Sequence, residues 1–187
     1  MTIPNGRVIL VAVLLAAVVI GGSLLQRRRP TVSPQFQGPS GALREKILAR
    51  QFVANLPAGP AGVPRCVLMD WNVGGGVATL VAFDDGSTSL YFSSGGGFIG
   101  AGAHQNVARA AAAFRAEGLR ALSRFTPTDT FPVPSQDGHV VFYAVMDSVT
   151  LTSGDIPAGM TGLPRGHPLS GLFTQAQSVV SEIRRAR

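Results

Sequence analysis

The fold of this chain is decided by one stretch of sequence, CVLMDWNVGGGVATLVAFDDGSTSLYFSS, which covers residues 66–94. Three runs rich in apolar, β-branched and aromatic residues alternate there with Gly74–Gly76 and Asp84–Gly86. Gly-Gly and Asp-Gly pairs readily adopt the positive φ angles that tight hairpin turns need. The stretch therefore predicts three antiparallel strands joined in a meander.

The middle run of the meander indicates how the sheet is covered. Residues 77–83 are apolar on both faces of the predicted strand, and Thr79 is the exception. A strand with one solvated face alternates apolar and polar residues, whereas a strand covered on both faces does not. We therefore expect helices, or a second copy of the domain, to cover both faces.

Further elements are predicted on either side of the meander. Apolar residues recur at helical spacing over 43–56 and 105–125, and again after Pro168. HVVFYAVM at 139–146 predicts a strand, and SVTLTS at 148–153 either continues it or returns as a fifth strand. In the first helix Arg44 and Arg50 are assigned to the surface. The positions expected to face the core are Leu43, Ile47, Leu48, Phe52, Val53, Val107, Ala111, Phe114, Gly118, Leu122, Phe125, Leu169, Leu172, Phe173, Ala176, Val180 and Ile183.

The order of these elements predicts a single α+β domain over residues 43–187. An antiparallel sheet of four or five strands would be packed with two or three helices. This order is similar in outline to profilin-like and roadblock-like scaffolds, although three strands rather than two precede the middle helix. Many such scaffolds are binding or dimerisation modules, so the resemblance implies that kind of role. It covers element order alone.

A transmembrane helix is predicted over residues 8–26, after a short tail at 1–7. Residues 8–25 read VILVAVLLAAVVIGGSLL, without a charge or a proline. At about 1.5 Å per residue this run approaches the roughly 30 Å hydrocarbon core of a bilayer. A cleaved signal peptide has a shorter apolar region. Because Leu24 and Leu25 extend the run and Arg27, Arg28 and Arg29 then stop it, we favour the anchor.

The flanking residues bear on orientation and reach. Positive residues near a span tend to stay in the cytoplasm, so Arg27, Arg28 and Arg29 favour a single-pass protein with its N-terminus outside and its domain in the cytoplasm. The rule leaves the opposite orientation open. Residues 27–42 combine this basic stop with a Pro- and Gly-rich tether. The chain's one cysteine, Cys66, cannot form an intramolecular disulfide.

The net charge of +6 does not indicate nucleic-acid binding. Four of the arginines flank the predicted span, and the rest of the chain carries 12 basic against 10 acidic residues. Phosphate binding needs a concentrated basic surface, and a domain at +2 lacks one. The expected partners are the lipid bilayer, through residues 8–26, and either a second copy or another protein.

The glycine-rich turn after the meander is the candidate ligand site. Residues 95–100 match G-x-G-x-x-G between a predicted strand and a predicted helix. The wider context of a dinucleotide-binding fold is missing, because the preceding strand lies in an antiparallel meander. Backbone N–H groups at a helix start can still hold an anion. The residues of this candidate site are Gly95, Gly97, Gly100, Gly102 and His104.

The remaining reactive residue types show no catalytic pattern. Cys66 opens an apolar strand, where a buried and unreactive thiol is expected. Asp70 lies mid-strand, and we expect a solvent-facing position or a backbone donor to satisfy it. The spacing of the histidines, cysteine and acids fits no metal site, so no metal and no cofactor are expected.

The sequence offers one possible contact surface on the middle helix, although a solvated face is the simpler interpretation. Arg109, Arg120 and Arg124 fall opposite its apolar stripe, where they would either be solvated or contact lipid headgroups or a partner. The sequence thus favours a non-catalytic interaction or dimerisation domain held at a membrane. The alternative is a domain that binds a small ligand, nucleotide or anion at residues 95–102.

Overall fold

The computed structural model describes residues 39–53 and 56–186. The predicted span at 8–26 and the arginines at 27–29 lie outside these residues. Within the described part of the chain, no helix has both the length and the apolar character needed to cross a bilayer.

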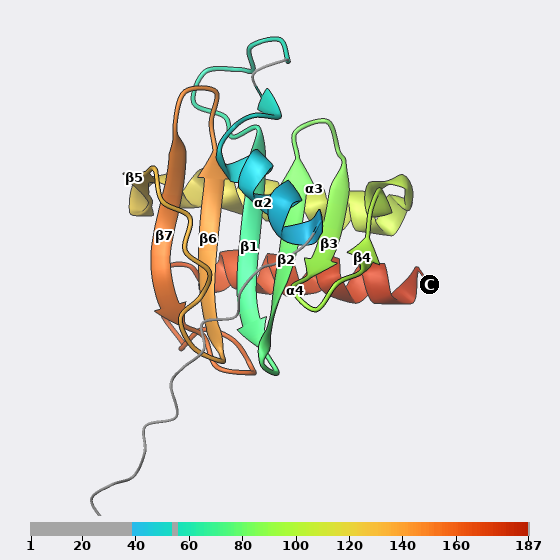
Figure 1. Cartoon of the computed structure of the whole chain (residues 1–187), viewed down its shortest axis with the longest axis vertical. Coiled ribbons are helices and arrows are strands. Elements are labelled where there is room, and N and C mark those ends of the chain that lie inside the picture. Colours follow the sequence, from blue (N-terminus) through green and yellow to red (C-terminus); the bar gives the residue numbers. More distant parts are fainter. Residues whose placement is uncertain (1–38, 54–55, 187) are drawn as a thin grey trace, which may run out of the picture. The chain divides into compact units, whose positions relative to one another are not determined.

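The described residues form one antiparallel sheet of seven strands with α-helices on both faces (Figure 1). This confirms the α+β class, but the sheet has more strands than the four or five predicted. The strand order is β4-β3-β2-β1-β6-β7-β5. The strands are β1 (Cys66–Val73), β2 (Gly76–Phe83), β3 (Thr88–Phe92), β4 (Gly97–Phe98), β5 (Thr126–Thr128), β6 (His139–Val145) and β7 (Thr150–Pro157).

The predicted meander is confirmed as β1, β2 and β3, which pair in sequence order. Gly74 and Gly75 take positive φ angles of 64° and 81° and turn the first hairpin. Val77 to Phe83 are all buried, so β2 is covered on both faces as expected. β7 returns beside β6, which settles the role of residues 148–153.

Three α-helices form the two outer layers among the described residues. α3 (Gln105–Ala121) and α4 (Ser170–Arg185) pack side by side on one face of the sheet, behind it in Figure 1. α2 (Pro39–Leu48) crosses the other face, in front of it in Figure 1. Two short 3-10 turns, η2 (Ala101–Ala103) and η3 (Leu122–Arg124), flank α3.

The sheet separates two hydrophobic clusters. The larger cluster lies under α3 and α4 and contains Val67, Met69, Leu80, Phe114 and Leu172 among others. The smaller cluster lies under α2; its members are Ile47, Leu48, Val53, Cys66, Leu68, Val81, Phe83, Tyr91, Val141, Tyr143 and Val145. Alternate residues of β1 and β2 enter opposite clusters, as the two-residue period of a strand requires.

The first helix differs from its prediction at both ends. It spans Pro39–Leu48 rather than 43–56, and Pro at a first helical position needs no N–H partner. Arg50 ends it with a φ of 60°. The N–H of Gln51 donates to Lys46 O and that of Arg50 to Ile47 O, which is a Schellman ending with an arginine where glycine is usual.

Candidate functional site

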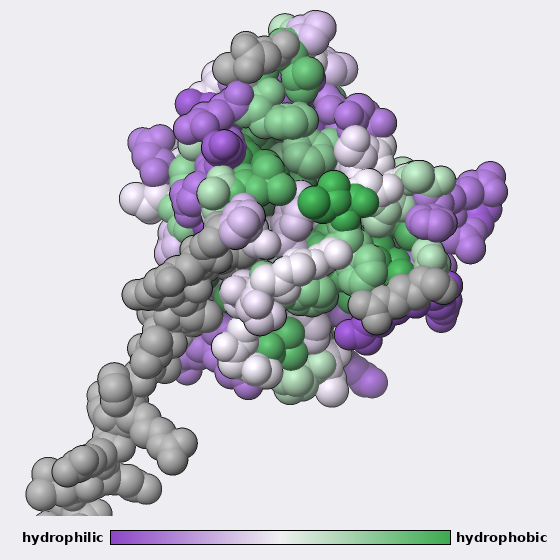
Figure 2. Space-filling model, turned by 45° about the vertical axis from the view of Figure 1, so that its right-hand side comes forward, coloured by the Kyte–Doolittle hydropathy of each residue, from purple (hydrophilic) through white to green (hydrophobic). Residues whose placement is uncertain are grey.

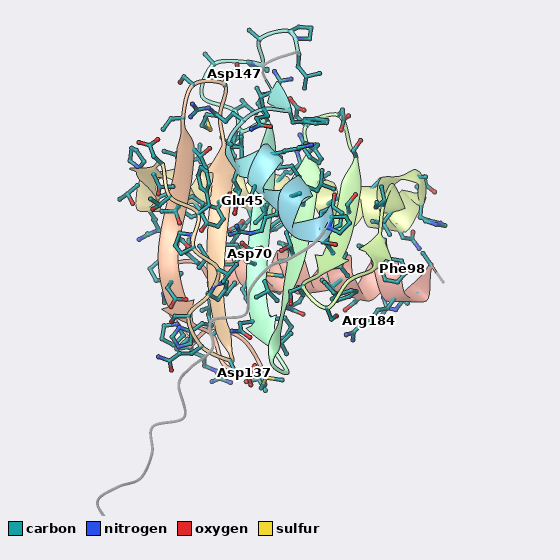
Figure 3. All side chains as sticks on the ribbon, in the orientation of Figure 1. Glu45, Asp70, Phe98, Asp137, Asp147 and Arg184 are labelled. Atoms are coloured by element: carbon teal, nitrogen blue, oxygen red, sulfur yellow. The ribbon has the colours of Figure 1, made fainter. Side chains whose placement is uncertain are left out.

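The most heavily built polar cluster lies under α2 and centres on Asp70. Its carboxylate has no exposed surface. Arg44 on α2 donates from Nε to Asp70 Oδ2 at 2.8 Å, and Arg44 Nη2 lies 2.6 Å from the same oxygen. The Thr79 hydroxyl donates to Asp70 Oδ1. Figure 3 shows Asp70 on β1 beneath the helix that carries Glu45.

The rest of the Arg44 guanidinium joins a third segment to this cluster. It donates to Phe131 O at 3.0 Å and Pro132 O at 3.3 Å, and it lies 5.6 Å from the centre of the Tyr143 ring. The Tyr143 hydroxyl donates to Pro132 O at 2.7 Å. One buried side chain thereby ties α2, the sheet and the coil at 131–132 together.

The charge state of the cluster follows from its contacts. Burial acts to lower the pKa of Arg44, but Asp70, together with smaller contributions from Tyr143 and Glu45, outweighs it, and the pKa is raised above its ordinary value. Arg44 is therefore a permanent cation inside the domain. With both partners nearly inaccessible to solvent, the pair can hold elements together but cannot reach a substrate in this conformation.

Both sequence expectations for these residues were wrong. Arg44 was assigned to the surface and is 1 % exposed, and Asp70 is satisfied by side chains rather than by solvent or a backbone donor. One signal was available: a turn at Gly74 and Gly75 pairs Asp70 with Thr79 across the hairpin, and these are polar residues in otherwise apolar strands.

A second arginine organises one end of the sheet. Arg65 pairs with Asp84 at 2.8 Å and with Asp147 at 3.4 Å, and it donates to Pro57 O. Gly59 N–H donates to Asp147, which Figure 3 shows at this end of the molecule. The cluster links the β2–β3 turn, the β6–β7 turn and the loop before β1, which is a structural role.

Cys66 lies beside this second cluster and is buried as expected. Burial, and to a smaller degree the charge of Asp84, raises the pKa of the thiol well above its ordinary value. The thiol therefore stays protonated at neutral pH, and a protonated thiol is a poor nucleophile.

The glycine-rich turn forms a hairpin rather than a strand-to-helix loop. Gly95 and Gly96 have positive φ angles and connect β3 to β4, and η2 then separates β4 from α3. At Gly97 a Cβ would lie 2.2 Å from Leu90 O, and at Gly102 it would lie 2.3 Å from Gly86 O. Backbone geometry thus accounts for these glycines without a ligand.

The structure divides the predicted ligand residues between two hollows. Gly97 lines a groove of about 330 Å³ between α2 and the β3–β4 turn. His104 lines a separate hollow with residues of the α3 start and the α4 end, including Glu182 and Arg185. Gly100 N–H donates to Ser89 Oγ at 3.4 Å. No convergence of these residues on one point is therefore seen.

The groove beside α2 is apolar in character. Ile99 stands at its margin with 79 % of its surface exposed, the largest exposure of any bulky apolar side chain in the described chain. None of the lining side chains carries a charge; they belong to Pro39, Ser40, Leu43, Tyr91, Gly96, Gly97 and Ile99.

The predicted basic surface lies on the other side of the sheet. Arg109 donates to Asn106, Arg120 pairs with Glu117 one turn away, and Arg124 is exposed. All three belong to α3 or the turn that follows it. They are therefore separated by the sheet from the groove and from α2.

In the described chain, no histidine is seen in contact with another histidine or with Cys66. His139 Nδ1 lies 3.1 Å from Asp155 Oδ2, and Ser135 also donates to that carboxylate. His167 Nδ1 accepts from Leu169 N–H. Across residues 39–53 and 56–186, no group of three or more His, Cys, Asp or Glu side chains is arranged to hold a metal ion.

Comparison with known proteins adds no relative: no protein family, curated protein or solved structure matches this chain.

Proposed function

We propose that this chain is a non-catalytic interaction domain held at a membrane surface by a helix at residues 8–26. The observation that carries the proposal is the exposed Ile99 beside an uncharged groove. Apolar side chains that gather around a hollow, rather than being scattered singly, are typical of sites that bind another surface. The interaction surface is thus the one formed by α2 and the β3–β4 turn.

The polar clusters support a non-catalytic role. Arg44 and Asp70 are closed off by α2, and Arg65 is engaged by two carboxylates and a carbonyl. Cys66 is buried and protonated. The two arginines and their carboxylates join elements of the fold, and the thiol is inaccessible, so none of these groups is offered to a substrate.

The anchor is supported by the apolar run at 8–25 and the three arginines after it. By the positive-inside rule, residues 39–186 lie in the cytoplasm. Arginines placed at Leu14 and Leu15 would each cost about 2.5–3.5 kcal/mol at the bilayer centre. The intact chain is expected to resist alkaline washing of membranes, and the L14R/L15R variant is expected to be released. Release of the intact chain by the wash would contradict the anchor.

The interaction role is tested on the anchored chain with a matched pair of variants. Ile99→Ser removes the exposed side chain beside the groove, and Leu119→Ser removes one that is 42 % exposed on α3. In membranes, we expect the yield of crosslinks between the domain and its neighbours to fall in I99S and to stay unchanged in L119S. Equal effects of the two variants would place the interaction surface elsewhere.

Anion or nucleotide binding at residues 95–102 is the alternative, and Gly97 at the groove is what favours it. The N–H groups of Gly95 and Gly100 are already bonded to Phe92 O and Ser89 Oγ, which leaves fewer donors for an anion. A rise in melting temperature with a nucleotide or inorganic phosphate would support it over the interaction role.

A further inference from the structure

One side of the domain carries two exposed apolar side chains. Tyr91 and Phe83 both belong to the hydrophobic cluster beneath α2. Ile99 lines the groove with Tyr91, and the ring of Phe52 lies 5.0 Å from that of Phe83, centre to centre. Ile99 and Phe52, the latter 48 % exposed, are therefore on the α2 side of the sheet.

The same side carries two cations without an ion-pair partner among the described residues. Lys46 is exposed on α2, and Arg50 follows the end of that helix. The carboxylate of Glu45, their neighbour on α2, is already engaged by Arg44. Figure 2 shows hydrophobic residues over the middle of this side and hydrophilic ones mainly toward its margins.

The tether brings this side within reach of lipid. Pro39 and Ser40, where the described chain begins, form part of the groove wall. Nine residues, 30–38, separate Arg29 from Pro39. At about 3.1 Å per residue for a polyproline-like chain, they span at most about 28 Å. Pro39 and the groove beside it are therefore confined to the neighbourhood of the bilayer surface.

We propose that the α2 face, defined by Leu43, Lys46, Arg50, Phe52 and Ile99, lies against an anionic bilayer and sets the orientation of the domain. The proposal rests on the anchoring proposed above and names the partner of the same surface. Apolar side chains beside cations suit the interface of an anionic membrane. A second copy docked by the same face would bring the unpaired cations toward each other, which disfavours that occupant.

The arrangement assigns the opposite layer a different role. With the α2 face on lipid, α3 and η3 face away from the membrane, and so do their arginines at 109, 120 and 124. These exposed arginines are then accessible to a protein partner rather than to lipid. Of lipid contact and partner contact, which the sequence left open for these arginines, the proposed orientation thus favours partner contact.

The test uses the full-length chain in vesicles with a fluorophore on one introduced cysteine. Cys66 is buried, so it does not compete for label in the folded chain. Ile99→Cys reports on the α2 face, and Leu119→Cys is the matched exposed apolar position on α3. The vesicles are phosphatidylcholine with or without phosphatidylserine, and each contains a lipid with a quencher on its headgroup.

With phosphatidylserine present, the label at 99 is expected to be quenched several-fold more than the label at 119. The charge reversal Lys46→Glu with Arg50→Glu should bring the two signals together, since each cation near an anionic leaflet contributes about a fivefold preference. Melting temperatures of all variants confirm that the fold is retained.

Each other outcome overturns a specific statement. Equal quenching at 99 and 119, or stronger quenching at 119, overturns the proposed orientation while leaving the anchor intact. Self-quenching at 99 that rises with chain density, without lipid quenching, assigns the face to a second copy instead. A chain that does not float with the vesicles after an alkaline wash overturns the anchor itself.

Discussion

Asp70 and Thr79 face each other across the β1–β2 hairpin, and the threonine hydroxyl donates to the carboxylate that Arg44 neutralises. The first helix, α2, is therefore held to the sheet by the buried carboxylate of Asp70 on β1, which is contacted by Arg44 from α2 and by Thr79 from β2. Such an arrangement is costly to break, because removing one partner leaves the other charged and buried.

Asp70→Asn is expected to lower the free energy of unfolding by about 3–5 kcal/mol, since it leaves the Arg44 cation buried without its counter-charge. Chemical denaturation of the full chain in mild detergent measures this. Replacing both partners, as Arg44→Met with Asp70→Leu, should cost less than Asp70→Asn alone. A double variant that is less stable than the single one would contradict a structural ion pair.

The effect of Gly118→Ala on stability is expected to change sign when Val67 is replaced by alanine. A Cβ at Gly118 would lie 2.6 Å from Val67 Cγ2, so α3 would be pushed off β1, at a typical cost of about 1–3 kcal/mol. Alanine favours the helix by about 1 kcal/mol over glycine. The substitution should therefore destabilise the natural chain and stabilise the Val67→Ala chain. Melting temperatures of the four proteins decide this, and the same sign in both backgrounds would show that no close contact exists.

Arg50→Gly is expected to stabilise the domain by roughly 0.5–1 kcal/mol. Arg50 has a φ of 60°, a region that L-residues with a Cβ occupy at a cost and glycine occupies readily. Arg50→Ala keeps the Cβ and provides the control, because it should give no such gain. Equal denaturation midpoints for the two variants would show that the arginine side chain, rather than its backbone, governs this helix end.

The free energy of unfolding is expected to fall as the pH rises above about 8.5, the ordinary pKa of a thiol. Burial raises the pKa of Cys66, so the unfolded chain releases its proton first and gains stability relative to the folded one. The slope contributed by this group reaches at most about 1.4 kcal/mol per pH unit. At pH 7 the thiol is protonated in both the folded and the unfolded chain, so its titration does not affect the free energy of unfolding there.

Cys66→Ala supplies the control for the pH experiment. It should remove the thiol's share of the slope between about pH 8.5 and 10, below the range where tyrosines titrate. Thiol labelling should likewise require unfolding. An unchanged slope in the variant, or fast labelling of the folded natural chain, would show that the thiol reaches solvent.

Much of the architecture could be predicted from periodicity and turn chemistry. Gly74 with Gly75 determined the first hairpin, and the repeat of Val107, Ala111, Phe114 and Gly118 located the buried side of α3. Such patterns are local and repeat several times, so they survive tertiary packing. β4 and β5, with two and three residues, are too short to carry a period.

The burial of Arg44 in the polar cluster under α2 was beyond prediction for a different reason. A long cation in an amphipathic helix is ordinarily solvated, and Arg44 is buried because its partner Asp70, 26 residues away, meets it in space. The glycine-rich turn carries a pattern with two interpretations. Its spacing fits a phosphate loop, and the structure also shows close backbone approaches at Gly97 and Gly102 that require glycine.

The contacts of Arg44 also have a mechanical consequence. α2 is the first element of the described chain, so a force from the N-terminal side enters the described domain at Pro39. Arg44, five residues after Pro39, is hydrogen-bonded to Asp70 on β1 and to the coil at 131–132. A force applied to the domain at Pro39 would therefore act on these contacts of Arg44 before it acts on any strand of the sheet.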